Sequence, residues 1–427
     1  MTADTGASMS EAGFDETLRA AINDPTELER LYRQNPVRFS HALPDLLQIR
    51  PDSLLLQAWS VRLAYDESAH PAESKPRLLE AAVIIGLALV AGTYARLPAF
   101  FSGIDEDPFT LRNLGLFFFP FAAAYFAFKQ RIPGRIAAWL GVLFMGALAY
   151  INMLPHPERS DTILLAAIHL PIVLWLLAGL AYGGGFALNV RTEYIRRTGE
   201  AVTYAALILI GGAALTGITI LLFQVIGLGI EEWYMTYIAV YGAVAAPLVA
   251  TAITYNQPRT RIAPLLARVF APLVLITLLV YLGTMGALRK SPYTDREFLL
   301  AFNLMLFGVL ALVTLSIAER TGTRTKSLTD YVNVGMVAVG LVLDLVALSA
   351  ILFRLASYGF TPNRIAVLGA NLLIFIHLTG ILIQYVLMLR GRTALHSVDT
   401  YTARYIVVYG IWAAFITFLF PLLYHFA

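Results

Sequence analysis

Residues 331–353 read YVNVGMVAVGLVLDLVALSAILF, a run of 23 residues in which Asp344 is the only charged side chain. A helix needs about 20 consecutive, mostly apolar residues to cross the hydrocarbon core of a bilayer. The run satisfies both conditions. It therefore predicts a membrane-spanning helix.

The composition of the whole chain has the same character. Apolar residues make up 58% of the 427 residues and charged residues 14%, whereas soluble globular domains have about 45–50% and 25%. So few charges would not cover a water-facing surface, which excludes an ordinary soluble enzyme, a disordered protein and a nucleic-acid binder. The chain has no cysteine, which excludes disulfides, thiolate nucleophiles and cysteine-ligated metals.

Apolar runs of spanning length recur along the chain. They predict an all-α fold, a polytopic transmembrane helical bundle of about 11 spans. The second run is short, so we expect it to be tilted or partly re-entrant. The predicted spans lie near residues 78–97, 113–128, 136–154, 162–183, 201–229, 233–255, 265–287, 298–318, 330–356, 364–389 and 402–425.

Residues 1–77 differ from the rest and predict a small N-terminal soluble helical domain with its linker, ahead of a transmembrane domain at 78–427. They hold 8 basic and 12 acidic residues. Asp24 and Pro25 are typical of a helix start. Two interpretations stay open for this domain: a platform packed on itself or on the membrane domain, and a docking site for a protein partner with Trp59 or Tyr32 as its anchor.

The distribution of basic residues predicts the orientation in the membrane. With the N-terminus inside, the interior loops of 78–427 carry 15 Lys and Arg residues and the exterior loops carry 8. Basic residues are enriched in cytoplasmic loops. We therefore expect the N-terminus in the cytoplasm and the C-terminus outside.

Two ionisable residues lie deep within predicted spans, where they are costly and need partners or water. Asp344 precedes the turn near Thr361 by 17 residues, and His377 follows it by 16. In an antiparallel hairpin the two would lie at nearly equal depth. An Asp344–His377 pair, or Asp344 bonded to Asn303 or Asn371, would clamp helices together. The same residues would also suit a proton or solute pathway.

No catalytic or cofactor motif accompanies them. The chain lacks a phosphate-binding GxxxxGK[ST] loop, an HExxH zinc motif and a GxSxG elbow. We therefore assign no catalytic residue, no metal ligand and no cofactor, and an enzymatic activity is the less favoured interpretation.

The segment RLASYGFTPNR at 354–364 combines a turn glycine, a helix-capping threonine and two arginines. Its own pattern predicts a rigid exterior hairpin, or alternatively a contact of the arginines with an anionic solute or lipid headgroup. It resembles the signature of a bacterial membrane family catalogued as domain of unknown function 4153. The matching positions are Arg354, Tyr358, Gly359, Thr361, Asn363 and Arg364. The resemblance implies a polytopic protein of the bacterial inner membrane and no established activity.

Two functions remain open on the sequence. The first is a secondary transporter or permease for an unidentified small solute, which the number of spans, the buried Asp344 and His377 and the intramembrane prolines favour. The second is a non-transporting scaffold, sensor or assembly factor whose residues 1–77 bind a protein partner. In both cases the lipid bilayer surrounds the chain, and nucleic acid is not a partner.

Overall fold

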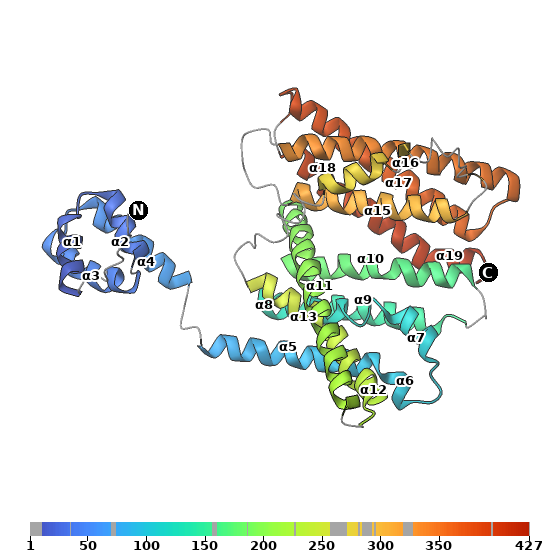
Figure 1. The fold of residues 1–427 in the computed structure, drawn as a ribbon, viewed down its shortest axis with the longest axis horizontal. Helices are drawn as coiled ribbons and strands as arrows, with labels where there is room; N and C mark the ends of the chain where they lie inside the picture. Colours follow the sequence, from blue (N-terminus) through green and yellow to red (C-terminus); the bar gives the residue numbers. More distant parts are fainter. Residues whose placement is uncertain are drawn as a thin grey trace. The chain divides into compact units, whose positions relative to one another are not determined.

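The computed structural model describes residues 11–34, 36–69, 74–155, 160–185, 187–225, 228–256, 271–280, 282–283, 293, 296–318, 328–393 and 396–426. These residues form helices joined by turns, with no strand among them. The chain divides into two compact units, Met1–Ala81 and Ala82–Ala427. Helix α5 (Ser74–Ala95) runs across the division (Figure 1).

The first unit has four short helices around its own apolar core. They are α1 (Glu11–Ala20), α2 (Pro25–Gln34), α3 (Pro36–Ile49) and α4 (Leu54–Ala69). The predicted start of α2 is confirmed, because Asp24 Oδ1 accepts hydrogen bonds from the backbone N–H of Thr26 at 2.9 Å and of Glu27 at 3.1 Å. The buried core residues are Phe14, Leu18, Ala21, Leu28, Leu31, Phe39, Leu43, Leu46, Leu56 and Trp59.

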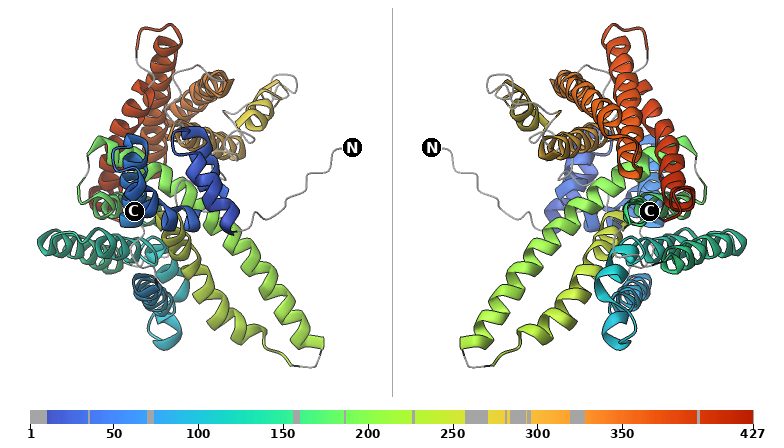
Figure 2. Two further views of the ribbon diagram at one scale, coloured as in Figure 1. Left: turned by 90° about the vertical axis from the view of Figure 1, so that its left-hand side faces the viewer. Right: turned by 90° about the vertical axis from the view of Figure 1, so that its right-hand side faces the viewer.

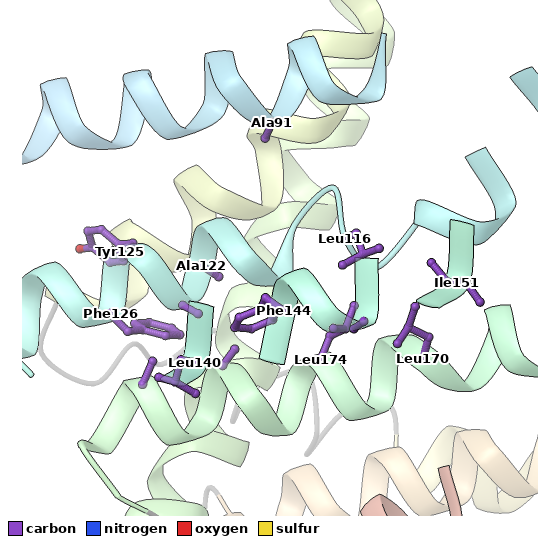
Figure 3. Packing of buried hydrophobic residues seen from close by; sticks show 14 of the residues in the cluster. Ala91, Leu116, Ala122, Tyr125, Phe126, Leu140, Phe144, Ile151, Leu170 and Leu174 are labelled. Carbon is purple, nitrogen blue, oxygen red and sulfur yellow. The ribbon is translucent and has the colours of Figure 1, made fainter. Parts of the chain in front are cut away.

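The second unit holds two groups of helices, each with a separate buried core. We call α5 to α13 the N-terminal group, and Figure 3 shows part of its core between Ala91 and Leu174. It contains α6 (Leu97–Phe100), α7 (Glu106–Asn113), α8 (Phe119–Gln130), α9 (Gly134–Met153), α10 (Asp161–Gly183), α11 (Leu188–Val225), α12 (Glu231–Trp233), the π-helical turn η1 (Tyr234–Ala239) and α13 (Val240–Asn256). Within it, α11 and α13 pack side by side (Figure 2).

The C-terminal group follows the segment 257–270, which lies outside the described residues. It contains a helical segment at Ala271–Val280, α15 (Arg296–Ala318), α16 (Leu328–Tyr358), α17 (Pro362–Leu389), α18 (Ser397–Ala414), the π-helical turn η2 (Phe415–Leu419) and α19 (Phe420–Leu423). Helices α15 to α18 pack successively against one another.

The all-α polytopic bundle predicted from the sequence is confirmed, and its apolar helices are consistent with an integral membrane protein. Eight described segments are long and apolar enough to cross a membrane: Leu78–Ala95, Gly134–Met153, Asp161–Gly183, Leu188–Leu221, Glu231–Asn256, Leu328–Tyr358, Pro362–Leu389 and Ser397–Leu423. The predicted span at 298–318 falls within α15, whose apolar part is Phe302–Ala318. The predicted span at 265–287 lies partly outside the described residues.

The predicted second span, 113–128, is not one continuous helix. Helix α7 ends at Asn113, a turn covers residues 114–118, and α8 begins at Phe119. The turn packs closely against the middle of α10: a Cβ added at Gly115 would lie 3.0 Å from Pro171 Cα. Helix α8 has 12 residues, about 18 Å at 1.5 Å per residue, which is too short to cross the bilayer alone.

A pair of leucines two residues apart tests the core of the first unit. Leu56 is fully buried and Leu54 is 81% exposed, both on α4. We expect Leu56→Ala to lower the free energy of unfolding of α1–α4 by about 2–5 kcal/mol, and Leu54→Ala to change it by less than about 0.5 kcal/mol. Hydrogen exchange of the purified full chain measures both values, and equal effects of the two variants would contradict this core.

Candidate functional site

The register between α16 and α17 follows from two contacts. The Asn333 side-chain amide donates to the Tyr385 hydroxyl at 2.9 Å. Nearer the hairpin, a Cβ added at Gly340 would lie 3.5 Å from Leu378 Cδ1. The two contacts describe the same antiparallel register, and both place the centre of the hairpin near Gly359.

This register gives the approximate relative depth of the two ionisable residues. Asp344 lies level with Ile374, and His377 lies level with Leu341. The two are therefore about three residues apart along the helix axes, or about 4.5 Å. Because this separation is less than one helical turn, the expectation of nearly equal depth stays a prediction.

His377 lies in a cluster of tyrosines on α18. Its ring stacks on Tyr405 with 4.3 Å between centroids and 5° between planes. The rings of Tyr401 and Tyr409 lie at 5.7 and 5.4 Å. His377 Nδ1 is hydrogen bonded to the Tyr409 hydroxyl at 3.0 Å, and His377 Nε2 has no hydrogen-bond partner in the described part of the chain.

Asp344 is fully buried, and neither of its carboxylate oxygens has a hydrogen-bond partner among the described residues. The hypothesised bonds from Asp344 to His377, Asn303 or Asn371 are therefore absent from these residues. The carboxylate is near enough to Tyr409 to interact with it electrostatically. Tyr409 is thus hydrogen bonded to His377 and interacts electrostatically with Asp344.

A cavity of about 640 Å³, here called the central cavity, lies between the two helix groups. Helices α8, α10 and α11 line it from one side, and α15, α17 and α18 from the other. Its lining consists of Phe119, His169, Pro171, Ile172, Trp175, Ile195, Thr198, Gly199, Phe307, Leu310, Ala311, Thr314, Leu315, Ala370, Ile374, His377, Thr402, Ile406, Tyr409 and Trp412.

Two smaller cavities adjoin it. The asparagine cavity, of about 190 Å³, is lined by Leu165, Ile168, His169, Ile172, Asn303, Leu306, Phe307, Ala366, Val367, Ala370, Asn371 and Ile374. The Arg197 cavity, of about 130 Å³, is lined by Phe118, Phe119, Ala122, Phe126, Trp175, Tyr182, Tyr194, Arg197, Thr198, Ala201, Val202, Ala205, Pro247, Thr251, Thr254 and Tyr255.

The three cavities follow one another along α10. Their walls on this helix run from Leu165 in the asparagine cavity to Tyr182 in the Arg197 cavity. These 17 residue steps correspond to about 25 Å, most of the roughly 30 Å hydrocarbon core. Neighbouring cavities share wall residues, so only side chains separate them.

Five buried polar atoms on the walls of the asparagine and central cavities have no hydrogen-bond partner in the described residues. They are Asn303 Oδ1, Asn371 Oδ1, His377 Nε2, Thr402 Oγ1 and Trp412 Nε1. Buried polar groups without a protein partner are uncommon and indicate water, an ion or a ligand. The structure thus brings Asn303, Asn371 and His377 to adjoining cavities.

Asp344 does not line these cavities, and sequence reasoning missed Thr402 and Trp412. Threonine and tryptophan are both common in apolar helices, so no sequence signal distinguished these two positions. His169 precedes Pro171 by two residues on α10. Its Nδ1 is hydrogen bonded to the Leu165 carbonyl at 2.8 Å, while the residue also lines both the asparagine and central cavities.

The Arg197 cavity has a charged but internally compensated wall. Arg197 pairs with Glu193 at 3.0 Å and with the fully buried Glu200 at 3.1 Å. It also donates to the Thr254 carbonyl at 2.6 Å. Glu193, Arg197 and Glu200 belong to α11, which begins at Leu188, before the start of the predicted span 201–229. The ion pair with Arg197 within the same helix explains how the Glu200 carboxylate is buried.

The hairpin between α16 and α17 is held by its own arginine. Arg364 Nη1 donates to the carbonyls of Tyr358 at 2.8 Å and of Gly359 at 2.7 Å. The Thr361 hydroxyl caps α17 by accepting from the Arg364 backbone N–H at 3.3 Å. Gly359 has a φ of +78°, a conformation that favours glycine. Arg364 is therefore engaged within the turn.

The two other motif residues flank this turn. Asn363 lies in the first turn of α17, and Arg354 lies near the end of α16. Arg354 Nε is buried without a hydrogen-bond partner among the described residues. Arg354 is therefore the better placed of the two arginines for an anionic group, and that role stays a prediction.

Within the described residues, His, Asp and Glu side chains do not gather in threes as a metal site would require. Comparison with models of known protein families, with curated proteins and with solved structures finds no match. The chemistry of the cavities therefore carries the functional proposal.

Gly359 provides a test of the hairpin geometry. Gly359→Ala places a side chain at positive φ, and we expect it to lower the free energy of unfolding by about 1–2 kcal/mol. Gly141→Ala, in the interior of α9 with open space around it, is the matched control and should be neutral or stabilising by about 0.5–1 kcal/mol. Unfolding of the purified protein in detergent measures both; no loss at Gly359 would contradict the turn.

Asp344 provides a test of the helix-clamp hypothesis. Because the carboxylate has no hydrogen bond to lose among the described residues, we expect Asp344→Asn to leave the unfolding free energy unchanged or raise it. Asn333→Ala removes donors to both Ser316 and Tyr385 and should cost about 1–3 kcal/mol. Denaturant unfolding compares the two. A larger loss of unfolding free energy for Asp344→Asn than for Asn333→Ala would support the helix-clamp hypothesis.

Proposed function

We propose that this chain is a membrane transporter or permease whose solute binds in the central cavity. The carrying observation is the line of three cavities along α10, which extends about 25 Å through the helical bundle. Solute sites of transporters occur near the bilayer midplane between structural halves and beside discontinuous helices. The central cavity lies between two helix groups, beside the break that precedes α8.

The shared walls suit gates on either side of a bound solute. Between the central and asparagine cavities lie His169, Phe307 and Ile374. Between the central and Arg197 cavities lie Phe119, Trp175 and Thr198. Trp175 Nε1 donates to the Thr198 hydroxyl at 3.1 Å, which ties α10 to α11 at this second constriction. Movement of a few side chains would open either end.

Asp344 and His377 belong to the proton or solute pathway in this proposal. His377 lines the central cavity and is hydrogen bonded to Tyr409. Asp344 lies within electrostatic reach of Tyr409 and lines none of the three cavities. A proton held at Asp344 would therefore change the field at the cavity wall through one tyrosine.

The proposed setting is the bacterial inner membrane, with the N-terminus in the cytoplasm and the C-terminus outside. The excess of basic residues in the interior loops supports this orientation. The tight hairpin formed by Tyr358, Gly359, Thr361 and Arg364 supports membership of the family of unknown function 4153.

A second candidate function is a scaffold, sensor or assembly factor that binds a protein through residues 1–77. The exposed apolar side chains of Leu54 and Val61, on one face of α4, favour it. Trp59 is buried in the core of that unit, so the hypothesis that it anchors a partner is wrong.

Single cysteines test whether the central cavity is open to water, because the chain has none of its own. We expect cysteines at Thr314 and Thr402, on the cavity wall, to react with a membrane-impermeant thiol reagent in right-side-out or inside-out vesicles. Cysteines at Leu304 on α15 and Ile411 on α18 are the matched controls, since these side chains are highly exposed on the same helices and line none of the three cavities.

A cysteine at Ser102, in the turn after α6, reports whether the reagent reaches the protein. If Ser102→Cys reacts and both cavity cysteines stay unlabelled from either side, the cavity is dry and transport is excluded. Capture of a stable partner through residues 1–77 would then favour the second function.

A further inference from the structure

We propose that the solute of the central cavity is an uncharged, elongated and mostly apolar molecule with a hydrogen-bonding group toward each end. This inference rests on the proposed transport function and adds the chemical class of the solute. Its basis is the distribution of polar and apolar side chains along the wall.

The wall carries no carboxylate, ammonium or guanidinium among the described lining residues. Its polar members are threonines, Tyr409, Trp175 and Trp412, together with His169 and His377. An ionised group buried without a counter-charge costs several kcal/mol at membrane depth. The buried carboxylates of Asp344 and Glu200 do not line the cavity. The wall therefore selects an uncharged molecule.

The hydrogen-bonding atoms lie toward opposite ends. The register of α17 and α18 follows from Gly369, which packs against the Trp412 ring, and Gly380, which packs against the Tyr401 ring. Trp412 therefore lies toward the hairpin, and Thr402 lies ten residues away on α18, about 15 Å along the axis. His377 lies near the Thr402 end.

Apolar side chains cover most of the stretch between these ends, and the Tyr409 hydroxyl within it is already hydrogen bonded to His377. Ile406 faces the cavity between Thr402 and Trp412, and Phe307, Leu310 and Ile374 contribute from α15 and α17. A hydrocarbon or ring body fits against them, because apolar surface gains most from contact with apolar surface. The indole N–H of Trp412 only donates, so the group bound there is an acceptor such as a hydroxyl, ether or carbonyl oxygen.

The size of the cavity agrees with such a molecule. At about 640 Å³ it falls within the range of about 300–1,000 Å³ of small-molecule sites. A bare inorganic ion would leave most of this space, and all of its apolar wall, without contact.

Photolabelling of the purified full chain tests the proposed chemical class of the solute. The probe is decan-1-ol carrying a diazirine at mid-chain, and mass spectrometry maps its adducts. Four competitors of equal chain length are compared at the same free concentration: decane-1,10-diol, decan-1-ol, decanoate and decylammonium. We expect adducts on the wall near Ile406 and Ile374, with protection by the diol and the alcohol and little protection by either ion.

Variants test the two ends. Thr402→Val and Trp412→Phe should each raise the concentration of diol needed for half-protection by about fivefold, as expected for one lost hydrogen bond. Thr417→Val is the matched control. Thr417 is buried in the π-helical turn η2, which continues α18, and its hydroxyl also lacks a hydrogen-bond partner in the described residues. It lines none of the three cavities. Trp139→Phe, at an exposed position of α9, controls for loss of an indole. Both controls should leave protection unchanged.

Equal protection by decanoate or decylammonium would overturn the uncharged class, and so would equal effects of Thr402→Val and Thr417→Val. In either case cavity adducts and labelling of Thr402→Cys would persist, so transport would stand. The absence of any cavity adduct would also overturn the proposed class of solute. The transport proposal would fail as well only if the cavity cysteines were unreactive.

Discussion

Every polar group within a bilayer must find its partner inside the protein, because the hydrocarbon offers none. Most of this bundle follows that constraint. Arg112, buried at the end of α7, donates to the carbonyls of Leu154 and Pro155, and Asn333 joins α15, α16 and α17 through Ser316 and Tyr385. Among the described residues, five buried polar atoms without a hydrogen-bond partner lie on the walls of the asparagine and central cavities, while others, such as the carboxylate oxygens of Asp344 and the Thr417 hydroxyl, lie apart from them. The five that share adjoining walls mark the candidate site.

Apolar run length predicted most of the spans, since crossing a bilayer imposes a minimum length on every helix. It missed the break at 114–118, because the apolar composition continues through the turn and only Gly115 and Pro120 mark it. It also placed the start of α11 too late, because the predicted span begins at residue 201 and the helix begins at Leu188. Glu193, Arg197 and Glu200 look like loop residues in the sequence, but they pair at helical spacing and so continue the helix.

The sequence predicted His377, Asn303 and Asn371 as site residues, but it predicted neither Thr402 and Trp412 nor the arrangement of the site. Asp344 and His377 stand out as ionisable groups within apolar runs, and that signal is local. Their relation depends on the centre of the turn, where an error of two residues shifts their relative depth by about one helical turn. Tyr401, Tyr405 and Tyr409 have helical spacing in the sequence, yet only the packing of α18 against α17 shows that they surround His377.

The backbone around the central cavity is irregular on some sides and regular on others. Phe119, at the second constriction, begins α8 directly after the 114–118 turn. Trp412 is followed by the π-helical turn η2, and Pro171 interrupts the hydrogen bonding of α10. By contrast, α16 and α17 are long helices joined by a turn that Arg364 ties to two carbonyls. In the proposed transport function, movement would therefore fall to α8, α10 and the end of α18, with the α16–α17 hairpin as the fixed frame.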